Sequence, residues 1–425
     1  MAKLAIKGGK KVLPNGIKVK WPQFDKSDEQ SLLKVFRSGV WWRGGTIELQ
    51  AASACGKFER DFAAYQNAKF GLCVPNGTIA VELALRAAGV KAGDEVVVPA
   101  LSFVVSASAA LPLGAIPVFA DCDPKTLQPD ADSIEAAISP RTTAIVIVHF
   151  GGYPADLDRI VKVARKHKLP LIEDCAHSQG SQWRGKGVGS YGQFGTFSFQ
   201  QSKALTCGEG GIVVCNSRDD WGKMYRFHNL GRLETQGFYD FYEVSSNYRL
   251  TDLQGALLNS QFVKMKKQVN VKMANTKALS AALRKIGGLE PLPEDKRITR
   301  RGYYYYCMQY DADEFKGLSR ADFLEAMAAE GVTMGRGYGR SIHEYPLFQN
   351  MKVPTKYAGA QYKKVECPNA VKAAGERLCA IHQAFLLAER SQFLKIADAV
   401  AKIKENVDEL VKAKSTARKA TAKKK

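Results

Sequence analysis

The sequence predicts an α/β fold in which a parallel or mixed sheet is covered by helices on both faces. Two observations carry this prediction. Short apolar segments rich in β-branched residues alternate with segments of helical period from about residue 77 to residue 174. The intervening helical segments are long enough for crossover connections, which favours parallel strands with helices on each face of the sheet.

The predicted elements of this region follow in order. We expect a helix in GTIAVELALRAAG (77–89), strands in DEVVVPA and AIPVFADC, and a helix that begins in DADSIEAAI. The segment TAIVIVHF (143–150) is a continuous apolar strand. An amphipathic helix, DLDRIVKVARKHK, and a further strand, LPLIEDCA, come after it.

The pattern changes after SSNYRLTDLQGALLNSQF (245–262). A long polar helix follows, then a strand in YYYYCMQYD and a helix in SRADFLEAMAAEGV. The run of tyrosines that starts at Tyr303 favours a strand packed on both faces. We therefore expect four parts: an N-terminal arm (1–40), a large α/β domain (41–265), a smaller α+β domain (266–411) and a basic tail (412–425).

The composition is typical of a globular protein with a core. Hydrophobic residues make up 45% and charged residues 24% of the 425 residues. No apolar run is long enough to span a bilayer, and the basic N-terminus is not followed by the apolar segment of a secretory signal. We expect a cytoplasmic protein with no membrane partner.

The formal net charge of +20 would suit an anionic partner. Much of this charge lies in the last fifteen residues, VKAKSTARKATAKKK, which hold seven Lys or Arg and no acid. Such a composition cannot build a core and predicts a disordered, solvated extension. Binding of nucleic acid or a membrane surface by the tail is the alternative. No DNA-recognition or RNA-binding motif elsewhere supports it, so we expect no nucleic-acid partner.

The cysteines predict neither disulfides nor a metal site. All nine are scattered, and none forms a Cys-x-x-Cys pair. The six histidines add no ligand cluster. We interpret the cysteines as reduced thiols, mostly buried.

The stretch FSFQQSKALTCGEGG (197–211) places Lys203 between an aromatic strand and a glycine-rich turn. Considered without the rest of the sequence, this stretch predicts only a lysine exposed at the surface. Residues whose chemistry complements that of a lysine lie at the ends of other predicted strands. An open α/β sheet binds its ligand at these strand ends. Asp174 could pair with a protonated pyridine nitrogen or cap a helix. Gly77 and Thr78 open a helix whose N–H groups suit a phosphate, and Phe103 could stack on a flat ring or fill the core. Together they predict a pocket for pyridoxal 5′-phosphate.

Five stretches carry a family resemblance: NGTIAVELAL, EDCAHSQGS, FSFQQSKALTCGEGG, NYRLTDLQGALL and CPNA. From about Lys18 to about Val411 the chain resembles the DegT/StrS-type sugar aminotransferases, which are pyridoxal-phosphate enzymes of fold type I. The resemblance implies a large domain with a mixed, mostly parallel seven-stranded sheet and a smaller C-terminal α+β domain.

The resemblance also assigns roles to residues by motif. Lys203 would form the Schiff base and Asp174 would hold the pyridinium nitrogen. The other implied cofactor contacts are Gly77, Thr78, Phe103, His177, Ser198 and Asn247. Asn247 would reach the phosphate of the neighbouring subunit, which implies a homodimer with a shared active site. Helix-start capping and a surface salt bridge are the alternatives for Asn247 and Arg249. We interpret Glu209 as structural.

His177 is a departure from many members of the family, which carry glutamine there to meet the phenolic oxygen of the cofactor. The chain resembles the branch of scyllo-inosose aminotransferases and 3-amino-5-hydroxybenzoate synthase in this histidine and in the SFQ before the lysine. It resembles the scyllo-inosose type also in its opening, AIKGGKKVLPNGIKVKWP, and in the pair Trp41-Trp42. The candidate substrate contacts are Trp42, Arg43, Arg249, Tyr338, His343 and His382. His149, His167 and His228 are interpreted as core or surface histidines.

The implied function is transfer of an amino group from glutamine or glutamate to a keto-cyclitol like scyllo-inosose, or to a keto-sugar. Freed Lys203 would act as base and then as acid. One alternative is a dehydrating, aromatising enzyme of the 3-amino-5-hydroxybenzoate synthase kind. Another is a non-catalytic member with a nucleic-acid-binding tail. A pyridoxamine-dependent dehydratase would carry histidine in place of Lys203, and the intact lysine speaks against it. The keto substrate, the donor and any assembly beyond a dimer stay open.

Overall fold

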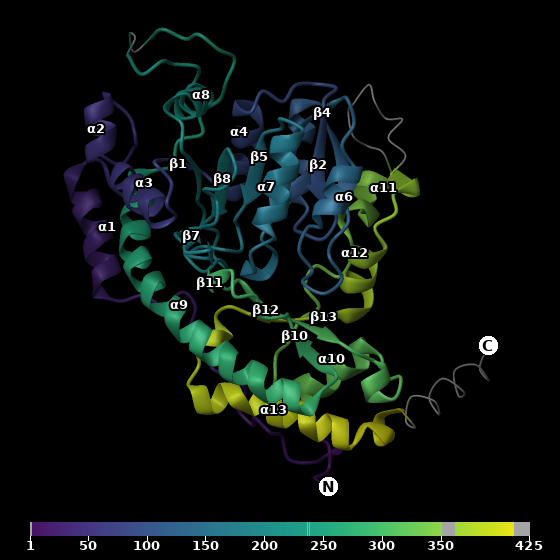
Figure 1. Ribbon diagram of the computed structural model, residues 1–425. Coiled ribbons are helices and arrows are strands. Elements are labelled where there is room, and N and C mark those ends of the chain that lie inside the picture. Colours follow the sequence, from purple (N-terminus) through teal and green to yellow (C-terminus); the bar gives the residue numbers. More distant parts are fainter. Residues whose placement is uncertain (1, 236, 238, 351–361, 412–425) are drawn as a thin grey trace.

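A computed structural model describes residues 2–235, 237, 239–350 and 362–411. The predicted basic tail (412–425) lies outside the described residues. The first half of the chain forms a seven-stranded sheet (Figure 1). Its strands are β1 (Phe70–Val74), β2 (Glu95–Pro99), β3 (Ile116–Ala120), β4 (Thr142–Val148), β5 (Leu171–Asp174), β8 (Phe194–Ser198) and β9 (Gly211–Cys215). They lie in the order β1-β9-β8-β5-β4-β2-β3.

Only β9 runs against its neighbours in this sheet, and β8, β5, β4, β2 and β3 pair in parallel. The predicted mixed, mostly parallel seven-stranded sheet is therefore confirmed. Successive residues of β4 belong to opposite cores, since Val146 packs with one cluster of buried side chains and Ile147 with another. This explains why TAIVIVHF is apolar throughout: both faces of the strand are buried.

Helices cover the two faces. The helices of this region are α2 (Ile47–Ala52), α3 (Ala54–Tyr65), α4 (Gly77–Ala87), α5 (Val105–Ser108), α6 (Ala131–Ala136), α7 (Leu157–Lys166) and α8 (Arg218–His228). The buried side chains of α4 and α8 belong to the core on one face, and those of α3, α6 and α7 to the core on the other. The predicted alternation of strands and helices between residues 77 and 174 is thus confirmed.

Helix α9 (Asp252–Ile286) connects this sheet to a second core. Phe262 and Val269 in its first half pack under the large sheet, whereas Leu279 and Leu283 pack in the second core. Helix α1 (Lys26–Ser38) lies along α9 (Figure 1). The expected domain division at residue 265 falls inside this single continuous helix, and the division stays a prediction.

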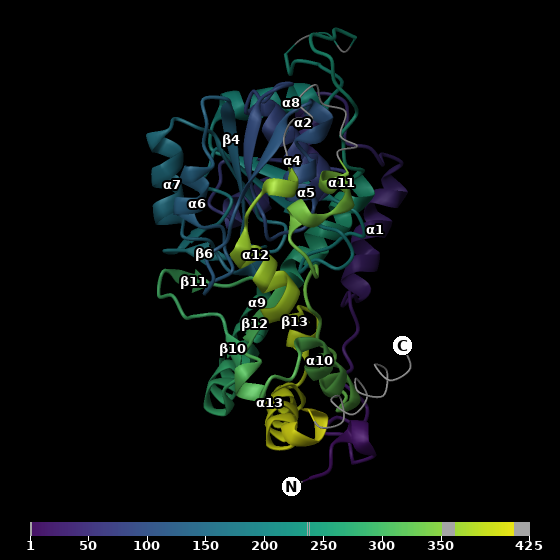
Figure 2. The same cartoon turned by 90° about the vertical axis from the view of Figure 1, so that its right-hand side faces the viewer.

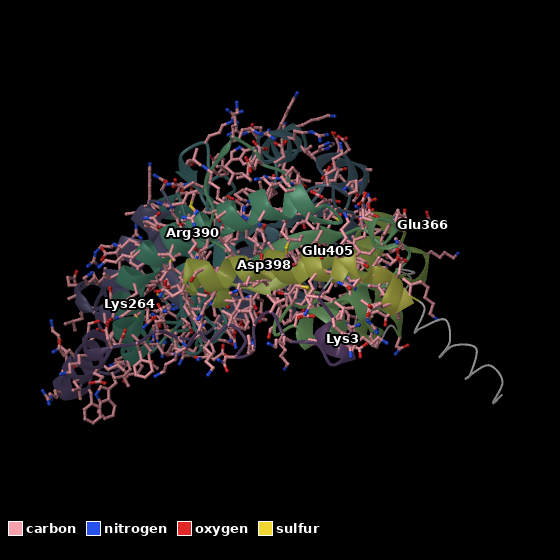
Figure 3. The ribbon with its side chains drawn as sticks, turned by 90° about the horizontal axis from the view of Figure 1, so that it is seen from below. Lys3, Lys264, Glu366, Arg390, Asp398 and Glu405 are labelled. Carbon is pink, nitrogen blue, oxygen red and sulfur yellow. The ribbon has the colours of Figure 1, made fainter. Side chains whose placement is uncertain are left out.

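The second core surrounds a three-stranded antiparallel sheet of β10 (Leu289–Pro291), β12 (Tyr305–Tyr310) and β13 (Leu378–His382). Helices α10 (Arg320–Ala329) and α13 (Arg390–Glu405) cover it, and α11 (Pro346–Gln349) and α12 (Pro368–Lys372) lie between them along the chain (Figures 1 and 2). Figure 3 shows α13 across the underside, with Arg390 and Glu405 at its two ends. Leu4 and Leu13 of the N-terminal arm insert into the same core.

A third small sheet joins the two parts of the chain. It consists of β6 (Gln182–Trp183), β7 (Lys186–Gly187) and β11 (Ile298–Arg300). The strand predicted from Tyr303 begins only at Tyr305, so Tyr303 and Tyr304 lie in the connection that precedes it. Among the helices that the structure describes, none is long and apolar enough to cross a membrane.

Candidate active site

A cavity of about 570 Å³ lies at the carboxyl ends of three adjacent parallel strands. Val148 from β4, Asp174 from β5 and Ser198 from β8 form its floor. The start of α4 and the connection after β8 contribute further walls, and Tyr304 and Tyr338 reach it from the second half of the chain. The predicted residues Gly77, Thr78, Phe103, Asp174, His177, Ser198, Lys203 and Tyr338 all line this cavity.

The start of α4 forms one wall and has the properties of a phosphate site. The Asn76 side chain caps the helix by accepting the N–H of Ile79 at 2.9 Å. Within the described part of the chain, no acceptor is bound to the N–H groups of Gly77 and Thr78, which open the helix. A Cβ on Gly77 would lie 2.6 Å from the Cβ of Ser198, so only glycine lets the backbone approach the serine. Free N–H groups at a helix N-terminus beside a hydroxyl group suit a phosphate.

Asp174 lies on the floor with its carboxylate held by neutral donors. The Ser106 hydroxyl donates to Oδ2 at 2.7 Å, and the N–H of Ala176 donates to Oδ1 at 3.1 Å. Ser102 in turn lies 2.8 Å from Ser106. No described cation forms an ion pair with Asp174, and the side chain is buried. A buried carboxylate of this kind suits a cationic ligand group such as a protonated ring nitrogen.

Lys203 projects into the same cavity from the connection after β8. Its residue is 9% exposed, and its Nζ lies 4.0 Å from the centre of the Tyr304 ring. Burial lowers the pKa of the Lys203 amine from its ordinary value of 10.5 to about 8, and the negative charge of Asp174 opposes part of this shift. The uncharged fraction of the amine near neutral pH is therefore much larger than that of an exposed lysine, which favours a role as a nucleophile or a general base.

His177 and Tyr338 form a pair on the opposite wall. The N–H of Gly151 donates to Nδ1 of His177 at 3.3 Å, so the ring proton resides on Nε2 and is donated to the Tyr338 hydroxyl at 2.8 Å. Burial and the charge of Lys203 lower the pKa of His177 well below its ordinary range, which keeps the ring neutral. The Tyr338 hydroxyl then keeps its own proton for a partner in the cavity. The His177 ring also stacks on Tyr304, with ring centres 4.3 Å apart.

These groups fit pyridoxal 5′-phosphate: a helix start for the phosphate, a carboxylate for the ring nitrogen and a lysine within one cavity. A model of the DegT/DnrJ/EryC1/StrS aminotransferase family matches residues 22–389. The chain belongs to this family. The predicted resemblance and the fold type are thereby confirmed.

The aminotransferase is 37% identical to an L-glutamine:2-deoxy-scyllo-inosose aminotransferase of Streptoalloteichus tenebrarius, over 92% of this chain and 95% of that protein. It is 33% identical to a 3-amino-5-hydroxybenzoate synthase of Amycolatopsis mediterranei, over 90% of this chain and 97% of that protein. Among solved structures, a 3-amino-5-hydroxybenzoic acid synthase superposes with a TM-score of 0.81 at 31% identity, covering 91% of this chain and 99% of that one.

Three other predicted residues of the aminotransferase lie outside the cavity because other contacts hold them. Arg43 is buried in an ion pair with Glu59 at 2.8 Å. The Nδ1 of His343 lies 2.9 Å from the Ser341 hydroxyl, and the histidine is buried beside Phe119. The Nε2 of His382 donates to the backbone carbonyl of Ser202 at 2.9 Å, which places it behind the lysine-bearing turn.

The last three predicted residues gather elsewhere on the surface. Trp42 is 48% exposed and lines a second cavity of about 420 Å³. The Arg249 guanidinium lies 5.7 Å from the Trp42 ring centre and donates to Asn229. Asn247 is exposed and accepts the N–H of Arg249. Within one chain these residues do not meet the cavity of Lys203, and their roles stay predictions.

Several cavity residues escaped sequence reasoning. Tyr304 sits in a run of four tyrosines, and no local pattern separates the one that faces Lys203 from its neighbours. Ser102 and Ser106 are four residues apart, which is the spacing of residues that share one face of a helix. This spacing could have predicted that the two hydroxyls lie together behind Asp174. Gln200 and Ser202 line the cavity next to Lys203, and the Ser202 hydroxyl lies 3.1 Å from that of Tyr304.

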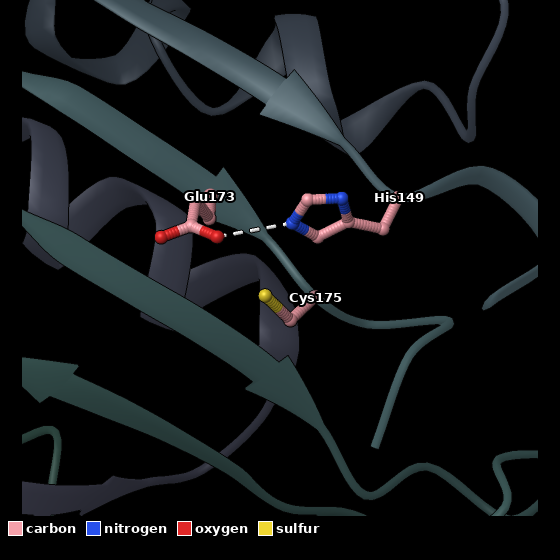
Figure 4. Close-up of side chains that lie close together, drawn as sticks. All are labelled: His149, Glu173 and Cys175. Atoms are coloured by element: carbon pink, nitrogen blue, oxygen red, sulfur yellow. Dashed lines mark hydrogen bonds and ion pairs between the residues drawn. The ribbon is translucent and has the colours of Figure 1, made fainter. Parts of the chain in front are cut away.

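His149, Glu173 and Cys175 form a buried cluster where β4 and β5 end (Figure 4). The spacing of their ligand atoms would admit a metal, but each histidine nitrogen is engaged. Nδ1 accepts the N–H of Ala155 at 3.0 Å, and Nε2 donates to Glu173 at 3.1 Å. The Glu173 carboxylate also accepts three backbone N–H groups of the loop 189–192. We interpret the cluster as an anchor that fixes this loop to β5.

Proposed function

We propose that this aminotransferase uses pyridoxal 5′-phosphate to transfer the amino group of L-glutamine to the ketone of a scyllo-inosose-type cyclitol. One observation carries the proposal: Lys203, Asp174 and the start of α4 converge on one cavity. Gly77, Thr78 and Ser198 would hold the phosphate, Asp174 the ring nitrogen and Lys203 the aldehyde carbon. Phe103, which is 48% exposed on the cavity wall, would cover one face of the ring.

When bound, the cofactor supplies an electron-accepting ring that stabilises negative charge at the carbon that loses its proton. The negative charge of Asp174 would keep the nitrogen of that ring protonated. Lys203 Nζ, largely uncharged above pH 8, accepts the proton from the α-carbon of the donor. In the second half-reaction the same amine returns a proton to the carbon of the acceptor. Such a placed acid–base group contributes about 10²–10⁴-fold to the rate.

The character of the cavity supports a polyol as the acceptor. Apart from Lys203 and the carboxylates of Asp174 and Glu209, its polar side chains are uncharged, among them the hydroxyls of Ser102, Ser202, Tyr304 and Tyr338 and the amide of Gln200. Hydroxyl and amide groups exchange hydrogen bonds with a hydroxylated ring. Among the described lining residues Lys203 is the only cation, so the phosphates of a nucleotide-linked sugar find no further counter-charge there. The similarity to a protein named as an L-glutamine:2-deoxy-scyllo-inosose aminotransferase supports the same class and glutamine as donor.

The direct test is product formation with labelled donor. The protein, loaded with pyridoxal 5′-phosphate, is incubated with 2-deoxy-scyllo-inosose and L-glutamine that carries ¹⁵N in the α-amino group. We expect a ¹⁵N-labelled aminocyclitol by mass spectrometry and none from Lys203→Ala. Label supplied in the side-chain amide must not reach the product. Absence of amine from all cyclitol and keto-sugar acceptors would overturn the proposal.

A second candidate function is formation of an aromatic amine by dehydration. The similarity to a solved 3-amino-5-hydroxybenzoic acid synthase favours it, and Lys203 would serve as the base there too. The two functions differ in their products. A dehydrating enzyme forms an ultraviolet-absorbing aromatic product from an amino-substituted ring ketone and consumes no glutamine.

We further propose that the working form is a homodimer with shared active sites, in a reducing compartment such as the cytoplasm. Within the described chain, Lys203 is the only basic side chain besides the neutral His177 on the cavity wall, so a donor carboxylate needs a cation from elsewhere. Exposed aromatic residues that suit a dimer interface are Phe36, Trp41, Trp42, Phe241 and Tyr242. All nine cysteines are buried free thiols, as in a reducing compartment.

Mixing inactive variants tests the shared site. Lys203→Ala and Asn247→Ala proteins are each expected to be nearly inactive, and a mixture after subunit exchange should regain about a quarter of wild-type activity, because half of the dimers are mixed and each has one intact site. Sedimentation must show a dimer. A monomer, or a mixture without recovery, would contradict the proposal.

A further inference from the structure

The turn that carries Lys203 is held from two distant parts of the chain, one at Trp21 and the other at His382 and Gln383. The N–H of Lys203 closes the turn by donating to the carbonyl of Gln200 at 2.8 Å. The indole N–H of Trp21 donates to the next carbonyl, that of Gln201, at 2.9 Å. The carbonyl of Ser202 accepts both His382 Nε2 at 2.9 Å and Gln383 Nε2 at 3.3 Å. The backbone beneath the lysine is therefore fixed by side chains and not only by its own turn.

A buried lysine of α9 stands behind this arrangement. Lys272 is 0% exposed, and its Nζ donates to Oε1 of Gln383 at 2.6 Å. The Trp21 ring covers the same ammonium, with its centre 5.5 Å away. In the described ranges no carboxylate forms an ion pair with Lys272. Burial of an amine with only an amide and a ring as partners costs stability, and an apolar side chain of similar volume would fill the site at lower cost.

The contact also determines which way the Gln383 amide faces. A lysine amine that donates must meet the amide oxygen, so the amide NH₂ is turned toward the carbonyl of Ser202. If the amide were reversed, its oxygen would oppose the Ser202 carbonyl, and its NH₂ would oppose the amine of Lys272. Lys272 therefore fixes the only orientation in which Gln383 can hold the lysine-bearing turn.

We propose that Lys272 is a positioning residue for Lys203, acting through Gln383 and the carbonyl of Ser202. The inference rests on the proposed role of Lys203 in amino transfer. It places a determinant of the reaction outside the cavity, on α9 between Val269, which packs under the large sheet, and Leu279, which packs in the second core. Loss of the contact between Lys272 and Gln383 lets the turn move. Displacement of a catalytic group by about 1 Å can reduce a rate by about 10²-fold.

The test compares Lys272→Met, Gln383→Leu and the double variant, with Lys267→Met as the control, since Lys267 is an exposed lysine of the same helix. We expect Lys272→Met to melt at the wild-type temperature or above it, while its kcat falls about tenfold or more and KM changes less than twofold. Gln383→Leu should show a similar fall, and the double variant no further fall than either single change. The control should match the wild type.

A second readout is independent of turnover. In the cofactor-free protein, the rate at which Lys203 is modified by an amine-reactive reagent is followed against pH by peptide mass spectrometry. Lys272→Met and Gln383→Leu should change this profile and Lys267→Met should not. Wild-type kcat and a wild-type profile in Lys272→Met, or multiplicative losses in the double variant, would overturn the proposal. If the wild type transfers no amine, the proposed function fails. The modification profile then still tests whether Lys272 positions Lys203.

Discussion

Gly77 lies so close to Ser198 that a Cβ at position 77 would come within 2.6 Å of the serine Cβ. This contact brings the first N–H groups of α4 and the Ser198 hydroxyl to one point. Gly77→Ala should therefore separate them and weaken binding of pyridoxal 5′-phosphate at least tenfold, as measured by fluorescence titration of the cofactor-free protein. Gly222→Ala is the matched control, because a Cβ there meets nothing within 4 Å. Equal affinity of Gly77→Ala and wild type would rule out this phosphate site.

The amine of Lys203 should titrate near pH 8 in the cofactor-free protein. Burial lowers its pKa to about 8 because the charged form is disfavoured, and the charge of Asp174 opposes the shift. Modification of Lys203 by an amine-reactive reagent should accordingly rise with pH around a midpoint of about 8. Asp174→Asn removes the opposing charge and should move the midpoint to lower pH. A midpoint near 10, or an upward move in the variant, would contradict the assignment.

Tyr338→Phe should impair the acceptor half-reaction more than cofactor binding. The change leaves the Nε2–H of His177 without its acceptor, and loss of a buried hydrogen bond costs about 1–3 kcal/mol. We expect kcat/KM for the ketone to fall about 10–100-fold, while the affinity for pyridoxal 5′-phosphate stays within about twofold. Tyr345→Phe, whose hydroxyl is 3.5 Å from the backbone carbonyl of Tyr338, serves as the control. Unchanged kinetics in Tyr338→Phe would remove this tyrosine from the substrate contacts.

Lys272 should make the stability of the protein depend on pH. Burial lowers its pKa from 10.5 to about 7, so between these values the unfolded chain binds one more proton than the folded one. The destabilisation is full below pH 7 and is lost as the pH rises toward 10.5. The stability advantage of Lys272→Met over the wild type should thus shrink by about 1.4 kcal/mol per pH unit between pH 7 and pH 10.

Denaturant unfolding at pH 7, 8 and 9 measures this difference. His382 and Lys203 are the titratable groups near Lys272, and each is present in both proteins. A difference that does not vary with pH would show that the amine of Lys272 keeps its ordinary pKa.

The fold and part of the candidate active site could be predicted from local sequence patterns. Apolar segments such as TAIVIVHF predicted strands because both faces of the parallel sheet are buried. Asp174 and Lys203 could be predicted because they end or follow such strands, and the carboxyl ends of parallel strands meet at one edge of the sheet. Ser198 was predicted only through the family resemblance.

The remainder depends on contacts between segments far apart in the chain. Tyr304 reaches the cavity from the second half of the chain, and no spacing relates it to Lys203. Tyr338 also comes from the second half and was predicted only through the family resemblance. The local sequence around Lys272 resembles that of any lysine on a polar helix, and its burial depends on contacts of α9 with Gln383 and Trp21. Arg43 and His343 were predicted at the substrate cavity, but a neighbouring carboxylate and a hydroxyl hold them elsewhere.

The most direct test of the central claim is the absorption spectrum of the protein loaded with pyridoxal 5′-phosphate, recorded before and after addition of L-glutamine. We predict that glutamine replaces the band of the lysine-linked cofactor by that of its amine form, and that 2-deoxy-scyllo-inosose then restores the original band. Lys203→Ala should bind the cofactor and show neither change. A wild-type spectrum that responds to neither glutamine nor glutamate would contradict amino transfer at Lys203.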